Sequence, residues 1–118
     1  MSSDDLILHL LIGPLMLFFS VIFILFPPKK INSLYGHRTS TSMLNPNTWK
    51  TANNLSSKMM LYVSIITCLI QLSSIILAID VEKSILYATL FLVVSLIFGV
   101  VLVEKELKKI FDNKGNRK

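Results

Sequence analysis

Apolar side chains are gathered in three long runs separated by polar segments. The runs extend over residues 6–26, 59–79 and 85–103, and none of them contains Asp, Glu, Lys or Arg. At a rise of about 1.5 Å per residue, each run forms a helix of about 30 Å, which matches the hydrocarbon core of a bilayer. The pattern therefore predicts an all-α integral membrane protein, with three transmembrane helices in one domain over residues 1–118.

Small and polar residues inside the runs predict how the helices pack. The first run contains Gly13-Pro14, and proline at this point predicts a bend that faces the other helices. On one face of the second run lie Ser64, Thr67, Cys68, Gln71, Ser74 and Ala78, and on one face of the third lie Ala88, Ser95 and Gly99. Such faces allow membrane helices to approach closely. We expect Gln71, Ser95 and Gly99 to be packing residues, with Gln71 bonded across a helix interface.

Basic and acidic connections alternate along the chain. The N-terminal tail carries Asp4 and Asp5, whereas the connection over residues 29–58 has five basic side chains and no acid. The short connection at 80–84 is net acidic and the C-terminal tail is net basic. The positive-inside rule therefore predicts an external N-terminus, a cytoplasmic C-terminus and a cytoplasmic long connection. We interpret the net charge of +5 as a topology signal and expect no nucleic-acid partner.

The composition offers little for enzyme or metal chemistry. With 53% hydrophobic and 16% charged residues, the chain is neither a water-soluble domain nor disordered. The single cysteine, Cys68, excludes an intrachain disulfide, and His9 and His37 are expected on opposite sides of the bilayer. No Gly-rich phosphate loop or hydrolase motif occurs. We therefore expect no enzymatic activity, no catalytic residue, no cofactor and no metal.

The C-terminal tail is expected to continue the third helix and then to fray. Glu104 lies four residues before Lys108, the spacing of a helical ion pair. After Phe111 the sequence is polar and contains a glycine, which is typical of a solvated end.

The connection over residues 29–58 has the composition of a folded segment, because aromatic and apolar residues are spaced through it. Asn45-Pro46 has the form of a helix start, with asparagine as N-cap and proline in the first turn. A helix that begins there places four residues on one face: Trp49, Ala52, Asn53 and Ser56. Gly36 suits a tight turn before them.

One stretch of this connection resembles a family signature. It consists of Tyr35, Gly36, Arg38, Thr39, Ser42, Met43, Asn45, Trp49, Ala52 and Asn53 at fixed spacing. This spacing is similar to that of the SdpI family, bacterial membrane proteins named for immunity to a secreted killing toxin. The pattern of one helix before the signature and two after it resembles the short members that consist of the SdpI domain alone. His37 stands where an apolar or aromatic residue is more usual.

The resemblance implies a membrane-embedded immunity protein of the bacterial plasma membrane, which protects the cell from a membrane-active peptide toxin or bacteriocin. Its binding or structural motif would be Tyr35, Gly36, Arg38, Thr39, Ser42, Met43, Asn45, Trp49 and Asn53. Two other classes stay open: a lipid or small-molecule transport accessory, and a membrane anchor that captures a cytoplasmic regulator. The candidate partners are membrane lipids, a peptide toxin, a cytoplasmic regulator and a second copy of the chain.

Two roles are open for Arg38. Its planar guanidinium could bind a phosphate or a carboxylate through two parallel hydrogen bonds. Alternatively, it could pair within the connection and hold its fold.

Overall fold

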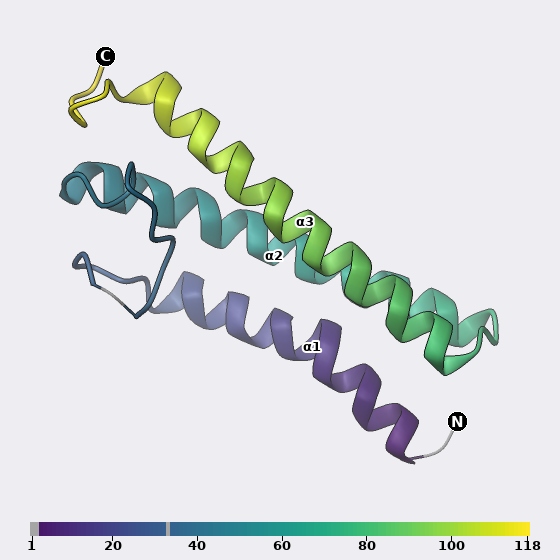
Figure 1. Ribbon diagram of the computed structural model, residues 1–118. Coiled ribbons are helices and arrows are strands. Elements are labelled where there is room, and N and C mark those ends of the chain that lie inside the picture. The colour runs from purple at the N-terminus through teal and green to yellow at the C-terminus, as the bar shows by residue number, and fades with distance from the viewer. Residues whose placement is uncertain (1–2, 33) are drawn as a thin grey trace.

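Three helices make up the fold of the computed structural model, which describes residues 3–32 and 34–118 (Figure 1). They are α1 (Ser3–Leu25), α2 (Pro46–Ile76) and α3 (Val81–Ile110). Each is long and apolar enough to cross a membrane. The expected all-α fold with three membrane-spanning helices is confirmed, whereas the orientation remains a prediction.

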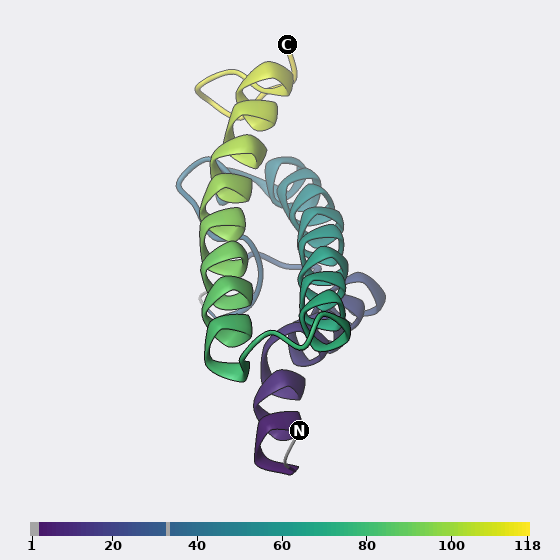
Figure 2. The ribbon, with the colours of Figure 1, turned by 90° about the vertical axis from the view of Figure 1, so that its right-hand side faces the viewer.

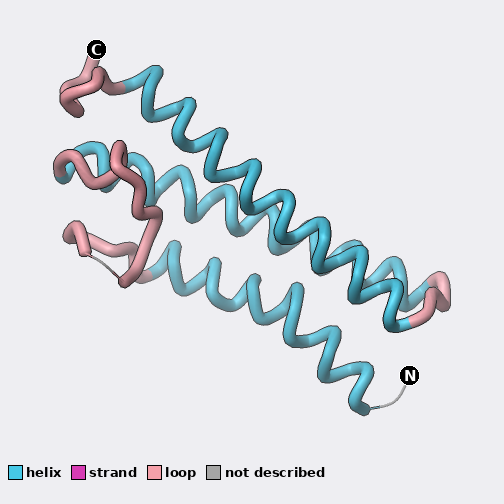
Figure 3. The backbone as a smooth tube through the Cα atoms, viewed as in Figure 1, coloured by secondary structure: helices cyan, strands magenta, loops and turns pink. Residues whose placement is uncertain are grey.

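The α2 helix packs against both α1 and α3, and α1 and α3 contact each other less (Figures 1 and 2). The start of α1 and the α2–α3 connection lie at one end of the bundle (Figure 1). The α1–α2 connection crosses the other end as an irregular loop, near the C-terminus (Figure 3). The two basic segments of the chain are thereby brought to the same end.

The start of α2 is fixed by a capping box at Asn45. Its side-chain Oδ1 accepts hydrogen bonds from the backbone N–H groups of Asn47 and Thr48, both at 2.9 Å. In return, Thr48 Oγ1 accepts from the Asn45 N–H at 3.0 Å. Pro46 in the first turn costs no hydrogen bond, because N–H groups there have no helical partner. The predicted helix start is confirmed, and α2 begins well before its apolar run.

The predicted packing face of α2 is confirmed for most of its members. Four of its polar residues are buried: Ser64, Thr67, Gln71 and Ser74. The three hydroxyl groups donate to carbonyl groups one turn earlier in α2, which satisfies them inside the bundle. Ala78 was wrongly placed on this face, because α2 ends at Ile76 and Ala78 lies beyond it at a φ of 55°.

The Gln71 side chain bridges two backbone groups of α1. Its Oε1 accepts from the Gly13 N–H at 3.0 Å, and its Nε2 donates to the His9 carbonyl at 2.9 Å. These groups are four residues apart and bond to each other in a regular helix. A Cβ atom at Gly13 would overlap Gln71 Oε1, so glycine makes room for the amide. The expected bond of Gln71 across a helix interface is confirmed.

Gly99 and Ser84 are two of the residues through which α3 contacts its neighbours. Gly99 is buried, and a Cβ atom there would overlap Met59 Sδ of α2. This glycine therefore serves packing within the chain, while Ser95 is half-buried and a homodimer remains a prediction. Near the other end of the bundle, Ser84 Oγ lies 3.0 Å from Nε2 of the buried His9 and joins α3 to α1.

The prediction of a frayed C-terminus was wrong. The Asp112 N–H donates to the Asn116 carbonyl at 2.8 Å, and the Lys118 N–H donates to the Ile110 carbonyl at 3.0 Å. Asn45 Nδ2 donates to the Gly115 carbonyl at 2.7 Å. The polar run therefore folds into a turn that docks on the start of α2, because its backbone groups find partners in the chain.

Candidate functional site

The α1–α2 connection is attached to α2 through Trp49. The indole is 1% exposed, and its Nε1 donates to the Pro28 carbonyl at 2.7 Å. Pro28 comes two residues after the end of the first apolar run. This hydrogen bond therefore holds the exit of α1 beside the first turns of α2.

Asn53 organises the turn at Gly36. Its Oδ1 accepts from the His37 N–H at 2.6 Å, and its Nδ2 donates to the Trp49 carbonyl at 2.9 Å. Gly36 has a φ of 110°, and a Cβ atom there would lie 2.5 Å from Asn53 Oδ1 and 2.8 Å from Pro28 Cγ. The predicted turn is confirmed, and both its backbone conformation and its surroundings require glycine.

Ser42 holds the segment that follows Gly36 in place through its hydroxyl group. Its hydroxyl is fully buried, donates to the His37 carbonyl at 2.7 Å and accepts from the Thr39 N–H at 2.8 Å. The Thr48 hydroxyl donates to the Ser42 carbonyl at 3.1 Å, which links this loop to the capping box. These contacts give Ser42 a structural role in the motif.

His37 links the α1–α2 connection to both α2 and α3. It is 8% exposed, and its Nδ1 lies 3.0 Å from Ser56 Oγ of α2. Its Nε2 lies 3.0 Å from Glu104 Oε1 of α3, and the Thr39 hydroxyl donates to the same oxygen. Because a carboxylate only accepts, Nε2 carries the proton in this contact. In the neutral ring, Nδ1 then accepts from Ser56.

Glu104 was missed as a site residue by the sequence analysis, which considered it only as a partner for Lys108. It directly follows the apolar run 85–103, the part of α3 that the sequence predicts to cross the membrane. Partial burial raises the pKa of the Glu104 carboxyl, but hydrogen bonds from Thr39, His37 and Thr41 outweigh this effect and lower its pKa below 4.5. The site therefore holds Glu104 as a carboxylate.

The remaining motif residues are more exposed. The Tyr35 hydroxyl donates to the Phe26 carbonyl at 2.9 Å, and its ring meets that of Phe23 edge to face at 5.4 Å. Partial burial raises the pKa of Tyr35. Arg38 and Met43 have exposed side chains. Arg38 is thus the charged motif residue that reaches the surface of the site.

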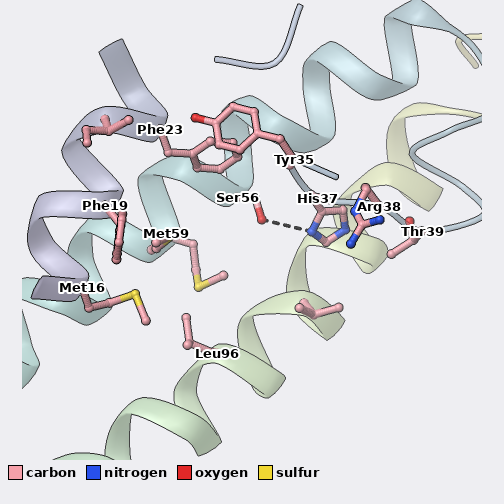
Figure 4. Close-up of a pocket in the computed structure, with 14 residues that line it drawn as sticks. Met16, Phe19, Phe23, Tyr35, His37, Arg38, Thr39, Ser56, Met59 and Leu96 are labelled. Atoms are coloured by element: carbon pink, nitrogen blue, oxygen red, sulfur yellow. Dashed lines mark hydrogen bonds between the residues drawn. The ribbon is translucent and has the colours of Figure 1, made fainter. Parts of the chain in front are cut away.

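A cavity of about 600 Å³ lies between the three helices, next to His37 and Arg38 (Figure 4). Its apolar walls come from Met16, Phe19, Ile22, Phe23, Met59, Met60, Leu96 and Val100. Its polar end is formed by Tyr35, Gly36, His37, Arg38, Thr39 and Ser56. The cavity is therefore amphipathic, with the motif at one end and membrane-spanning helices around the rest. Methionine-rich walls adapt to side chains of different shapes.

The structure brings the motif residues together in different roles. Gly36, Ser42, Asn45, Trp49 and Asn53 hold the connection in place through the contacts above. Tyr35, Arg38 and Thr39 also line the cavity. Over the described ranges, no three His, Cys, Asp or Glu side chains are grouped as metal ligands.

Comparison with known proteins gives one family and one curated relative. The model of the SdpI/YfhL protein family matches residues 29–103, which contain the connection, α2 and most of α3. A protein of Bacillus subtilis (strain 168), named "Uncharacterized protein YfhL", is 45% identical over 49 residues. The aligned part covers 42% of this chain and 44% of that protein, so the chain matches less than half of its relative. No solved structure matches the chain.

Proposed function

Since the chain belongs to the SdpI/YfhL protein family, we propose that it is an immunity protein of the bacterial plasma membrane. The family resemblance predicted from residues 35–53 is confirmed, and the three helices agree with a multi-pass membrane protein. Members of the family are known for immunity, and the activity proposed here is protection of the cell from a membrane-active peptide toxin.

The observation that supports this function is the amphipathic cavity. Peptides that act on membranes carry an apolar face together with polar or charged groups. A volume of about 600 Å³ lies within the range of ligand pockets and accommodates a few side chains. The Met and Phe walls would receive the apolar side chains of such a peptide and remove them from lipid.

The polar end of the cavity would bind the backbone or a carboxylate of the peptide. Backbone groups that lack partners are costly inside a membrane, so a toxin segment gains most where polar side chains line the site. Arg38, Thr39 and Tyr35 line this end. The Arg38 guanidinium is always charged and offers a planar fork to a carboxylate.

A survival assay with matched tryptophan variants tests this function. Leu96 lines the cavity, whereas its neighbour Ile97 is 63% exposed on the outer surface of α3. A sensitive host expressing the parent chain, Leu96→Trp or Ile97→Trp is exposed to the secreted peptide toxin for which the family is named. We expect the parent and Ile97→Trp to protect, and Leu96→Trp to lose protection because the indole fills the cavity. Full protection by Leu96→Trp at matched membrane level would refute this use of the cavity.

A second variant addresses the two roles of Arg38. Arg38→Lys keeps the positive charge but loses the planar fork. If Arg38 binds the toxin, protection falls while membrane insertion persists. Protection equal to that of the parent would leave Arg38 a role in topology and loop packing alone.

A further inference from the structure

A second cavity, of about 640 Å³, lies between the exit of α1 and the first half of α2. It shares no lining residue with the cavity in Figure 4, and no residue of α3 lines it. It is therefore a separate site that the proposed immunity function does not use.

The charged groups around this second cavity all have the same sign. Lys29, Lys50 and Lys58 line it, together with the polar side chains of Asn54 and Ser57, and no carboxylate is among the lining residues. In the described part of the chain, no ion pair joins these three lysines to an acid. The cavity therefore fits an anion.

The fold brings these lysines together from two separate segments. Lys50, Asn54, Ser57 and Lys58 are spaced by four, three and one residues, which places them on one face of α2. Lys29 follows Pro28, whose carbonyl is held by Trp49. The contact that fixes the connection thus also places Lys29 against the lysine face of α2.

The cavity lies at the depth of lipid headgroups. Lys58 directly precedes the apolar run that begins at Met59, and Lys29 comes three residues after the first run ends at Phe26. The lining also includes the apolar residues Ile24, Pro27 and Pro28. A ligand at this position meets lysines on one side and hydrocarbon on the other.

We propose that this second cavity binds the phosphate of an anionic phospholipid, such as phosphatidylglycerol. The lysine ammonium groups neutralise the phosphate, and the Asn54 amide can donate a hydrogen bond to the headgroup, whereas the Ser57 hydroxyl already donates to the Asn54 carbonyl at 2.9 Å. The apolar lining residues Ile24, Pro27 and Pro28 contact the first part of an acyl chain. A free phosphate would be attracted by the lysines but would make no contact with the apolar residues, so the lipid is the better occupant.

Native mass spectrometry of the full chain, released from nanodiscs with equal amounts of phosphatidylglycerol and phosphatidylcholine, tests this site. We expect the parent to retain phosphatidylglycerol preferentially. Lys50→Gln and Lys58→Gln should each weaken this retention roughly tenfold or more, because each removes a charge-assisted hydrogen bond to the phosphate, a larger effect than the general attraction of one lysine to the membrane. Lys30→Gln is the matched control, because Lys30 adjoins Lys29 but does not line the cavity.

Three results would overturn the proposal. Equal losses in Lys30→Gln and in the cavity variants would mean that total charge, and not this cavity, attracts the lipid. Equal retention of both lipids by the parent would exclude selection of an anionic headgroup at this site. Displacement of phosphatidylglycerol by millimolar inorganic phosphate would assign the cavity to a free anion. Circular dichroism of each variant identifies misfolding, and either Lys50→Gln or Lys58→Gln suffices if the other does not fold.

Discussion

Trp49 offers the sharpest test of how the connection is attached to the bundle. Its side chain is 1% exposed, and truncation of a buried tryptophan to alanine costs about 3–5 kcal/mol. Trp49→Phe keeps most of the buried ring but leaves the Pro28 carbonyl without its indole donor, which costs about 1–3 kcal/mol. The structure therefore predicts a graded loss of stability, larger for Trp49→Ala than for Trp49→Phe.

The assay is thermal unfolding in mild detergent, followed by circular dichroism, because Trp49 is the one tryptophan of the chain and its removal abolishes indole fluorescence. Tyr62→Ala serves as the control, since Tyr62 is an aromatic residue of the same helix that is 65% exposed. Its change should stay within about 0.5 kcal/mol of the parent. A Trp49→Ala variant that unfolds together with Tyr62→Ala would refute the attachment of the connection through the indole.

The remaining predictions concern the capping box, the Glu104 carboxylate and the orientation. Asn45→Ala should lower the free energy of unfolding by about 1 kcal/mol or more, measured by the same thermal assay, because it removes the N-cap and a bond to the C-terminal turn. Glu104 has a lowered pKa in the fold, so its stabilisation is complete above pH 4.5 and is lost as the pH falls through the folded pKa. The unfolding midpoint of the parent should therefore fall with acidification below pH 4.5 more than that of Glu104→Gln, and parallel curves would contradict the pair. In intact cells, a cysteine at Asp80 should react with an impermeant reagent and one at Ser40 should not, and the reverse pattern would invert the orientation.

Much of the fold could be predicted because it depends on local rules. Uncharged runs of about 20 residues have few alternatives to membrane helices. Asn45-Pro46 specifies its own helix start, because both residues act on the backbone of the next turn. Gly36 and Gln71 were also recognised. A tight turn favours glycine, and a polar side chain in an apolar run needs a hydrogen-bond partner.

The contacts that were missed join residues that are distant in the sequence. Glu104 lies 67 residues from His37, and its helical spacing to Lys108 offered a local partner instead. The short α2–α3 connection could have indicated this contact. It makes α2 and α3 a hairpin, which brings residues after the third apolar run beside residues before the second. The docking of the C-terminal turn was missed for the same reason, since its partner Asn45 is 70 residues away.

The proposed immunity function is tested most directly by locating the toxin on the protein. A photoreactive phenylalanine analogue is placed at Phe19, which is 51% exposed and lines the cavity, or at Phe18, which is 59% exposed and does not line it. Cells expressing each variant are exposed to the toxin and irradiated, and the cross-linked product is quantified by mass. The cavity model predicts a toxin adduct at Phe19 and little at Phe18. Equal adducts at both positions, or none at Phe19 in cells that remain protected, would contradict it.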